Sequence, residues 1–135
     1  MVLVNCTTRS KIFPSVIPDE NEAGRSAARV LLQHGHGDRI VLVGETPPYV
    51  MAAVERLAGI SAVLRESGLE PAGSVDTRWW PNPAFEAVGA YLAQGHRPSA
   101  FICLNDRVAL GAYQACQVAG PVSYTHLTLP TILLV

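Results

Sequence analysis

The sequence of 135 residues is poor in charge and in the features that mark membrane or nucleic-acid-binding proteins. Charged side chains make up 16% of the chain, the net charge is −1, and no cluster of lysine and arginine occurs. This composition argues against a nucleic-acid-binding surface in this segment. No apolar run approaches the length of a membrane-spanning helix. The first residues lack the basic and long apolar regions of a signal peptide, so we expect a cytoplasmic protein.

Sequence patterns for metal binding and catalysis are absent as well. The cysteines Cys6, Cys103 and Cys116 show no metal-type spacing, and we interpret them as reduced thiols, two of them packed. No phosphate-binding glycine loop and no G-x-S-x-G elbow occurs. His34 and His36 lie at a glycine-rich helix end without a third ligand, which favours a solvated turn over a metal site. We therefore predict no enzyme activity, no metal and no cofactor.

The sequence does contain short apolar runs that alternate with amphipathic segments. Apolar residues make up 49% of the chain, which is typical of a globular protein with a real core. Residues 40–43 and 100–104 are continuous apolar runs, as expected for strands covered on both faces. Weaker strands are predicted at 2–5, 15–17 and 74–79, and helices at 19–33, 50–67, 82–94 and 107–119. This order predicts an α/β fold, a parallel sheet with flanking helices.

Finer predictions concern helix ends and faces. Asn82 and Asp106 are suited to cap the helices that follow them, and the acids within 19–22 suit the positive end of the first helix. Gly59 and Gly111 are interpreted as packing positions, where small side chains let helices approach the sheet. The apolar face of the second helix is predicted to consist of Val50, Val54, Leu57, Ser61 and Leu64.

The last residues differ in character from the rest. Residues 122–135 look like one reading frame of the transposon-end adapter used in DNA sequencing libraries, and the codon of Pro121 can straddle the junction. The alternative is a genuine β-rich tail, because threonine, tyrosine and leucine favour strands. We interpret 122–135 as adapter-derived and exclude it from the prediction of the fold. The coding DNA distinguishes the two interpretations.

Three signals fall just after predicted strands or on the helix that follows. They are Glu-Arg-Leu-Ala-Gly at 55–59, Trp79, and Leu-Asn-Asp-Arg-Val-Ala-Leu-Gly-Ala at 104–112. In an open parallel α/β sheet, ligands bind at the carboxyl ends of the strands. Arg56 can donate a rigid fork of hydrogen bonds, Trp79 offers a flat apolar face, and Asn105 both donates and accepts. Together these groups suit a polyhydroxylated small molecule.

These signals, in this order, resemble the effector-binding core of the lac-repressor and purine-repressor family of bacterial transcription regulators. The resemblance covers about residues 2–120. It implies a partial periplasmic-binding-protein-like type I fold, mainly its C-terminal subdomain. Residues 1–18 would be a remnant of the N-terminal subdomain, and 19–121 a partial effector-binding subdomain. A helix-turn-helix, most of the first subdomain and the closing strands are missing, so we expect a segment of a longer gene product.

The resemblance also implies a binding site. The implied effector contacts are Arg56, Trp79, Asn105 and Asn5, the last of which ends the first predicted strand. Each of the first three has an alternative interpretation. Arg56 can be a solvated helix residue, Trp79 a core or rim aromatic with Trp80 as its competitor, and Asn105 a loop cap.

The implied function is ligand-controlled transcription. A sugar or nucleoside-like effector would close two subdomains by hinge motion and shift a homodimeric parent protein between states of different DNA affinity. This chain would supply the sensing core without the DNA-binding domain. Two alternatives remain open. One is the periplasmic sugar-binding component of a transporter, which shares the fold, and the other is a Rossmann-like enzyme, supported by fold analogy alone.

Overall fold

A parallel sheet between two pairs of helices forms the body of the chain. The computed structural model describes residues 1–6, 10, 12–44, 47 and 50–120. The sheet has the strand order β4-β3-β5, all parallel, with β3 at Ile40–Val43, β4 at Gly73–Val75 and β5 at Ala100–Cys103. This arrangement confirms the predicted α/β fold.

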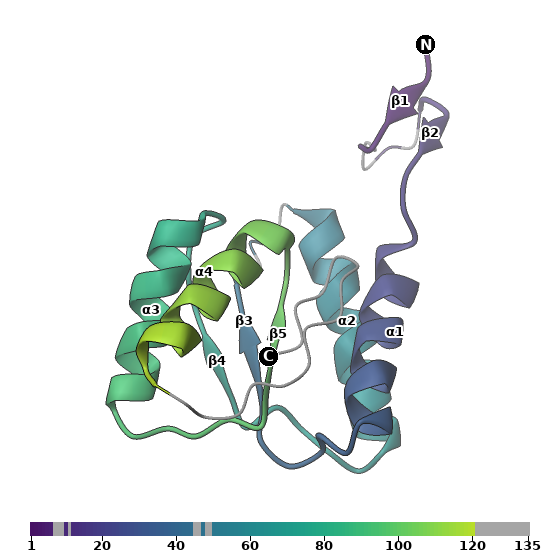
Figure 1. Ribbon diagram of the computed structural model, residues 1–135. Helices are drawn as coiled ribbons and strands as arrows, with labels where there is room; N and C mark the ends of the chain where they lie inside the picture. The colour runs from purple at the N-terminus through teal and green to yellow at the C-terminus, as the bar shows by residue number, and fades with distance from the viewer. Residues whose placement is uncertain (7–9, 11, 45–46, 48–49, 121–135) are drawn as a thin grey trace.

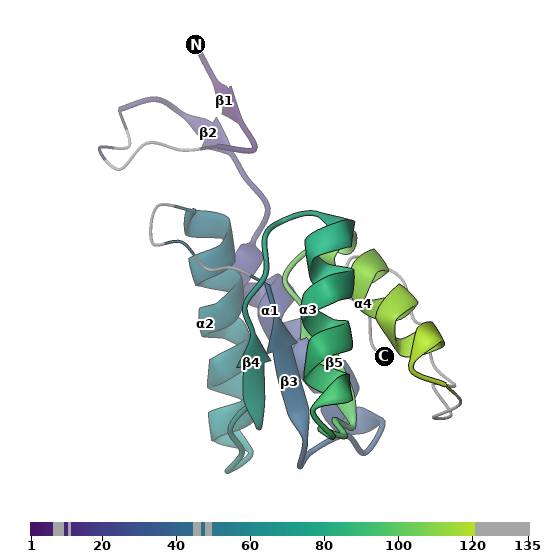
Figure 2. The ribbon, with the colours of Figure 1, turned by 90° about the vertical axis from the view of Figure 1, so that its left-hand side faces the viewer.

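The helices cover the two faces of the sheet in pairs. The helices are α1 (Glu20–Gln33), α2 (Met51–Glu66), α3 (Pro81–Ala93) and α4 (Asp106–Val118). Figures 1 and 2 show α1 and α2 on one face of the sheet and α3 and α4 on the other. No described helix is both long enough and apolar enough to cross a membrane.

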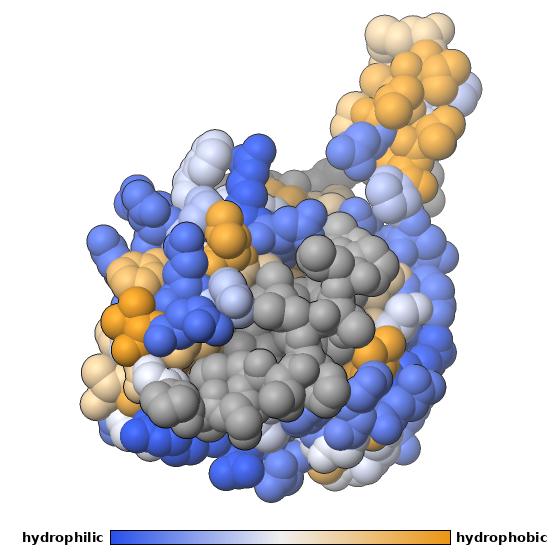
Figure 3. Space-filling model, in the orientation of Figure 1, coloured by the Kyte–Doolittle hydropathy of each residue, from blue (hydrophilic) through white to orange (hydrophobic). Residues whose placement is uncertain are grey.

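A smaller parallel pair of strands precedes this body. β1 (Leu3–Val4) pairs with β2 (Ser15–Val16), which confirms the two predicted N-terminal strands, although both are shorter than expected. In Figure 1 the pair stands apart from the three layers and is joined to α1 by residues 17–19. Figure 3 shows apolar surface gathered on this pair. The exposed large apolar side chains of the described residues in and around the pair are Met1, Val2, Val4, Ile12, Phe13, Val16 and Ile17.

The core consists of two clusters, one on each face of the sheet. Successive side chains of a strand point to opposite faces. Val41 and Phe101 accordingly pack with α3 and α4, whereas Ile40 and Ile102 pack with α1 and α2. All four are at most 1% exposed. Helices on both faces therefore explain why β3 and β5 are continuous apolar runs in the sequence.

The cysteines follow the sequence-based interpretation. Cys103 and Cys116 are buried in the cluster under α3 and α4, Cys6 is exposed, and all three are free thiols. Burial raises the pKa of the Cys103 thiol, and the neighbouring Cys116 raises it further. Cys103 therefore remains a neutral thiol that packs as a small apolar side chain.

Glycines let the paired helices approach backbone to backbone. A Cβ atom on Gly24 of α1 would lie 2.1 Å from the carbonyl oxygen of Arg56, and one on Gly59 of α2 would lie 2.0 Å from that of Asn21. A Cβ on Gly111 of α4 would lie 2.1 Å from a backbone oxygen of α3. Gly59 and Gly111 are thus packing positions, as predicted, but they bring α2 against α1 and α4 against α3 rather than against the sheet.

Two predictions about the surroundings of α3 are wrong. β4 ends at Val75 rather than at 79, because its ladder partner β3 ends opposite, at Val43. Asn82 does not cap α3, since the helix already begins at Pro81 and the N-cap position is Trp80. Proline suits the first turn of a helix, where its missing N–H has no intrahelical partner in any case.

The start of α4 and the face of α2 also differ from the prediction. Asn105, not Asp106, caps α4, because its side chain accepts a hydrogen bond from the backbone N–H of Val108 at 2.9 Å. Of the predicted apolar face of α2, Leu64 is buried and the other members are partly buried. The close approach of α1 at Gly59 turns a different face inward. The buried residues of α2 are Ala53, Gly59, Ile60, Val63 and Leu64.

The N-cap of α1 yields a first prediction. The Asp19 side chain accepts a hydrogen bond from the N–H of Glu22 at 2.9 Å, so Asp19→Ala is expected to lower the free energy of unfolding by about 1 kcal/mol. Asp38→Ala is the matched control, because exposed Asp38 pairs with its neighbour Arg39 at 3.5 Å and should change stability by less than about 0.5 kcal/mol. Urea denaturation measures both variants. Equal losses would show that Asp19 does not act as a cap in solution.

Candidate functional site

The carboxyl ends of β3, β4 and β5 lie at one edge of the sheet, because the three strands are parallel. α2, α3 and α4 begin at this edge, and the predicted residues Arg56, Trp79 and Asn105 belong to these helix starts or to the loops before them. In Figure 1 the β1–β2 pair stands on the side of this edge. The edge is therefore the place where the larger sheet faces the smaller one.

Arg56 is held on two sides. Its Nε donates to Oε2 of Glu20 at 2.9 Å, its Nη2 donates to the same oxygen, and its Nη1 donates to the backbone carbonyl of Leu104, just after β5. The Arg56 and Glu20 side chains are 18% and 15% exposed. Arg56 therefore ties α1, α2 and the end of β5 together, and its side chain is mostly buried rather than solvated.

Asn105 follows Leu104 directly and so lies beside this ion pair. Its Oδ1 accepts a hydrogen bond from the backbone N–H of Val108, which confirms capping as one role of the side chain. The capping bond leaves the two N–H groups of Nδ2 for another acceptor. No hydrogen bond from Nδ2 is found among the residues that the structure describes.

Two adjacent tryptophans stand at the start of α3. Trp79 is half-buried in the loop after β4, whereas Trp80 is 57% exposed. The guanidinium carbon of Arg107, in the first turn of α4, lies 4.5 Å from the centre of a Trp80 ring. This cation–π contact brings the starts of α3 and α4 together and places Trp79 at the same edge as Asn105.

Asn5 lies elsewhere in the molecule. It follows β1, is exposed, and has a backbone φ of 56°, a left-handed conformation that asparagine tolerates better than most residues. Its N–H donates to the carbonyl of Val16 at 2.8 Å. The structure thus brings Arg56, Trp79 and Asn105 to one edge and leaves Asn5 on the separate strand pair.

Comparison with known proteins identifies the family. Residues 1–128 match the family model for periplasmic binding proteins and the sugar binding domain of the LacI family. The chain belongs to this family. The matched range includes 122–128, the beginning of the segment that we interpret as adapter-derived, and that interpretation stays a prediction.

Curated relatives of this LacI-family chain are repressors. It is 33% identical over 108 residues to the HTH-type transcriptional repressor PurR of Pasteurella multocida, covering 78% of this chain and 32% of that protein. The PurR of Escherichia fergusonii is 32% identical over 108 residues, with 78% and 31% covered. The chain thus spans about a third of the length of these relatives.

Solved structures show the same fold in repressors and in periplasmic proteins. A dimeric lac repressor with an 11-residue C-terminal deletion has a TM-score of 0.76 and 25% identity, with 88% of this chain and 43% of that chain covered. The fructose binding periplasmic domain of a hybrid two component system has a TM-score of 0.77 and 26% identity, with 88% and 40% covered. The periplasmic-binding-protein-like fold of a partial domain is thereby confirmed.

The sequence-based prediction explained Glu20 by the helix dipole alone and did not include its contact with Arg56. Gly24 and Gly59 set α1 against α2. Glu20 lies one turn before Gly24, and Arg56 lies one turn before Gly59, so the two charged side chains meet. Each of the two helices has a charged residue one turn before a glycine, and the two charges are of opposite sign. This pattern in the sequence would have revealed the pair.

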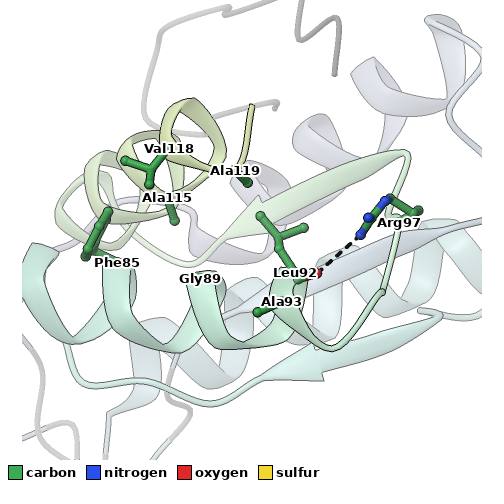
Figure 4. Close-up of a pocket in the computed structure, with 8 residues that line it drawn as sticks. All are labelled: Phe85, Gly89, Leu92, Ala93, Arg97, Ala115, Val118 and Ala119. Atoms are coloured by element: carbon green, nitrogen blue, oxygen red, sulfur yellow. Dashed lines mark hydrogen bonds between the residues drawn. The ribbon is translucent and has the colours of Figure 1, made fainter. Parts of the chain in front are cut away.

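A cavity lies away from this edge, between α3 and α4. It has a volume of about 430 Å³, and residues of the second halves of both helices form most of its lining (Figure 4). Arg97 donates to the carbonyl of Leu92 at 3.2 Å beside it. Its lining is mostly apolar, and the complete set is Phe85, Gly89, Leu92, Ala93, Arg97, Ala115, Val118 and Ala119. Among the described residues, no group of three or more side chains that could hold a metal ion is found.

Proposed function

We propose that this chain is the effector-sensing core of a LacI-type transcription regulator. The observation that carries the proposal is the placement of Arg56, Trp79 and Asn105 at the same carboxyl edge of the sheet in a member of the LacI family. The edge combines hydrogen-bond donors with an aromatic ring. Such a surface suits recognition of a small polar molecule.

Each proposed contact has a distinct role toward a sugar or nucleoside-like effector. Arg56 retains two N–H groups beyond its bonds to Glu20 and Leu104, and Asn105 retains those of Nδ2. Trp79 offers a ring on which the apolar face of a sugar or base can stack. Asn5 would reach the same ligand from the smaller sheet when the two parts close.

The parent protein would be a cytoplasmic homodimer that binds DNA through a domain that this segment does not contain. The effector would favour one of two states that differ in DNA affinity. The second candidate is a periplasmic sugar-binding component of a transporter, and the similarity to a fructose binding periplasmic domain favours it. A helix-turn-helix upstream in the gene would support the regulator, and a signal peptide the transporter component.

The test uses the product of the complete gene. Thermal melting in the presence of a panel of monosaccharides and nucleosides should identify an effector by its stabilisation of the protein. The same compound should change the binding of the protein to DNA upstream of its gene in a gel-shift assay. Stabilisation by a sugar without any DNA binding would favour the transporter component, and turnover of a panel compound would favour an enzyme.

Asn105→Asp separates the capping role of this residue from its proposed binding role. The carboxylate still accepts from Val108 and suits the positive end of α4, so the free energy of unfolding should change by less than about 0.5 kcal/mol. The two N–H donors are lost, and affinity for the effector should fall about tenfold or more, that is by at least about 1.4 kcal/mol. Calorimetric titration with the effector measures this change.

The matched control is Asp106→Asn, at the exposed neighbouring position. This variant should bind the effector as the unaltered protein does. If Asn105→Asp keeps its affinity as well, Asn105 is a cap and not a ligand contact.

A further inference from the structure

Glu20 and Arg56 together offer a ligand both hydrogen-bond donors and a hydrogen-bond acceptor. Arginine carries five N–H groups. Two of them are bonded to Oε2 of Glu20 and one to the carbonyl of Leu104, which leaves two. No hydrogen bond to Oε1 of Glu20 is found among the described residues. Unused donors and an unused acceptor therefore lie side by side.

The pair is also electrically neutral, and its neighbourhood adds no excess of positive charge. Both side chains are mostly buried, so solvent and salt screen the negative charge of Glu20 only weakly. The other charged side chains that follow β4 and β5 are Asp76, Arg78, Asp106 and Arg107, all exposed, two of each sign.

We propose that Glu20 and Arg56 together select an uncharged polyol and reject an anionic ligand. The inference rests on the proposed function, in which Arg56 contacts the effector. A sugar hydroxyl both donates and accepts, so two adjacent hydroxyls can accept from Arg56 and donate to Oε1 of Glu20. A phosphate or carboxylate can accept from Arg56, but it would also lie close to the negative charge of Glu20.

The helix starts at this edge act in the opposite sense and are weaker. α2 and α3 begin without a side-chain cap, and free N–H groups at a helix start attract anions. A helix start is equivalent to about half an elementary charge, whereas Glu20 carries a whole charge in contact with the arginine that the ligand must reach. Glu20 therefore cancels the attraction of Arg56 for an anion, which leaves only the weaker attraction of the helix starts.

Removal of the charge of Glu20 tests the pair with inorganic phosphate as the probe. In Glu20→Gln the amide retains an acceptor for Arg56, but the arginine loses its counter-charge. The variant should bind phosphate at least about tenfold more tightly than the unaltered chain does, as followed by the NMR signals of the backbone N–H groups of Leu57 and Asn105, which every variant retains. The double variant Glu20→Gln/Arg56→Gln should lose this gain.

Glu22→Gln is the matched control on the same helix. Glu22 is exposed and pairs with Arg25 and Arg29 rather than with Arg56, so its loss should leave phosphate binding unchanged. A gain in the control equal to that in Glu20→Gln, or no gain in Glu20→Gln, would overturn the proposal.

A second measurement needs no variant and remains decisive if Glu20→Gln fails to fold. The unaltered protein is titrated with ribose and glucose and with their phosphate esters. Preference for the neutral sugars supports selection by the pair. Equal or tighter binding of the esters refutes that selection but leaves the sensing function intact. If the complete gene product responds to no sugar or nucleoside of the panel, the proposed function fails, whatever phosphate does at Glu20→Gln.

Discussion

Gly59→Ala is expected to lower the free energy of unfolding of this chain by about 3 kcal/mol, at the upper end of the usual cost of overpacking. The added Cβ atom would lie 2.0 Å from the carbonyl oxygen of Asn21. Because this atom belongs to the backbone of α1, no side-chain rotation relieves the clash, and the two helices must move apart. For a chain of this size the loss corresponds to a fall of roughly 10–20 °C in melting temperature. Circular dichroism melts measure it.

Gly89→Ala is the control for this prediction. Gly89 lies inside α3, and a Cβ atom there meets nothing within 4 Å. Alanine is the better helix former, so this variant should gain about 0.5–1 kcal/mol. If the two alanine variants melt alike, the helices are not in backbone contact at Gly59 in solution.

Arg56→Ala in the complete gene product is expected to weaken effector binding roughly ten- to hundredfold, or about 1–3 kcal/mol. Polar groups of the ligand would lose their donors in a closed cleft. The ion pair adds a second consequence, because Glu20 would be left mostly buried without its partner. We therefore expect a loss of stability as well, of about 1–3 kcal/mol. Calorimetric titration and thermal melts of the free protein measure the two losses separately.

Arg56→Lys distinguishes binding from folding. The ammonium group restores a positive charge beside Glu20, but it lacks the planar fork that bonds two acceptors at once. Stability should largely recover, whereas the loss of affinity should persist. Full affinity in both variants would assign Arg56 a purely structural role and remove the central contact of the proposed site.

The larger sheet was predictable because its central strands are covered on both faces. Ile40–Val43 and Ala100–Cys103 are apolar throughout, and the structure has both as predicted within a residue. β4 was predicted too long, since residues 76–79 keep a weak alternation after the partner strand has ended. The sequence pattern of one strand does not indicate where the neighbouring strand of the sheet ends.

The candidate site was predictable where its signal was local, and not where it depended on helix pairing. Arg56 and Asn105 stand beside strand ends within recognisable motifs, and their positions at the edge follow from the order of strands and helices. Glu20 is 36 residues before Arg56 in the chain, and its contact depends on how α1 meets α2. The cap of α4 was misplaced by one residue, because Asn105 and Asp106 are both good N-cap residues.

The short stretch between β2 and α1 has a consequence for protein engineering. The buried apolar core of the described residues begins at Ala27, so the described residues up to Pro18 can be exchanged without touching a core side chain. A crossover point at residues 17–19 would allow the unit of α1–α4 and the larger sheet to be grafted behind the N-terminal half of another protein of the same family. A crossover between β3 and α2 would instead divide both core clusters. In hybrid proteins joined there, each cluster would combine core side chains from two different proteins, which would not pack well together.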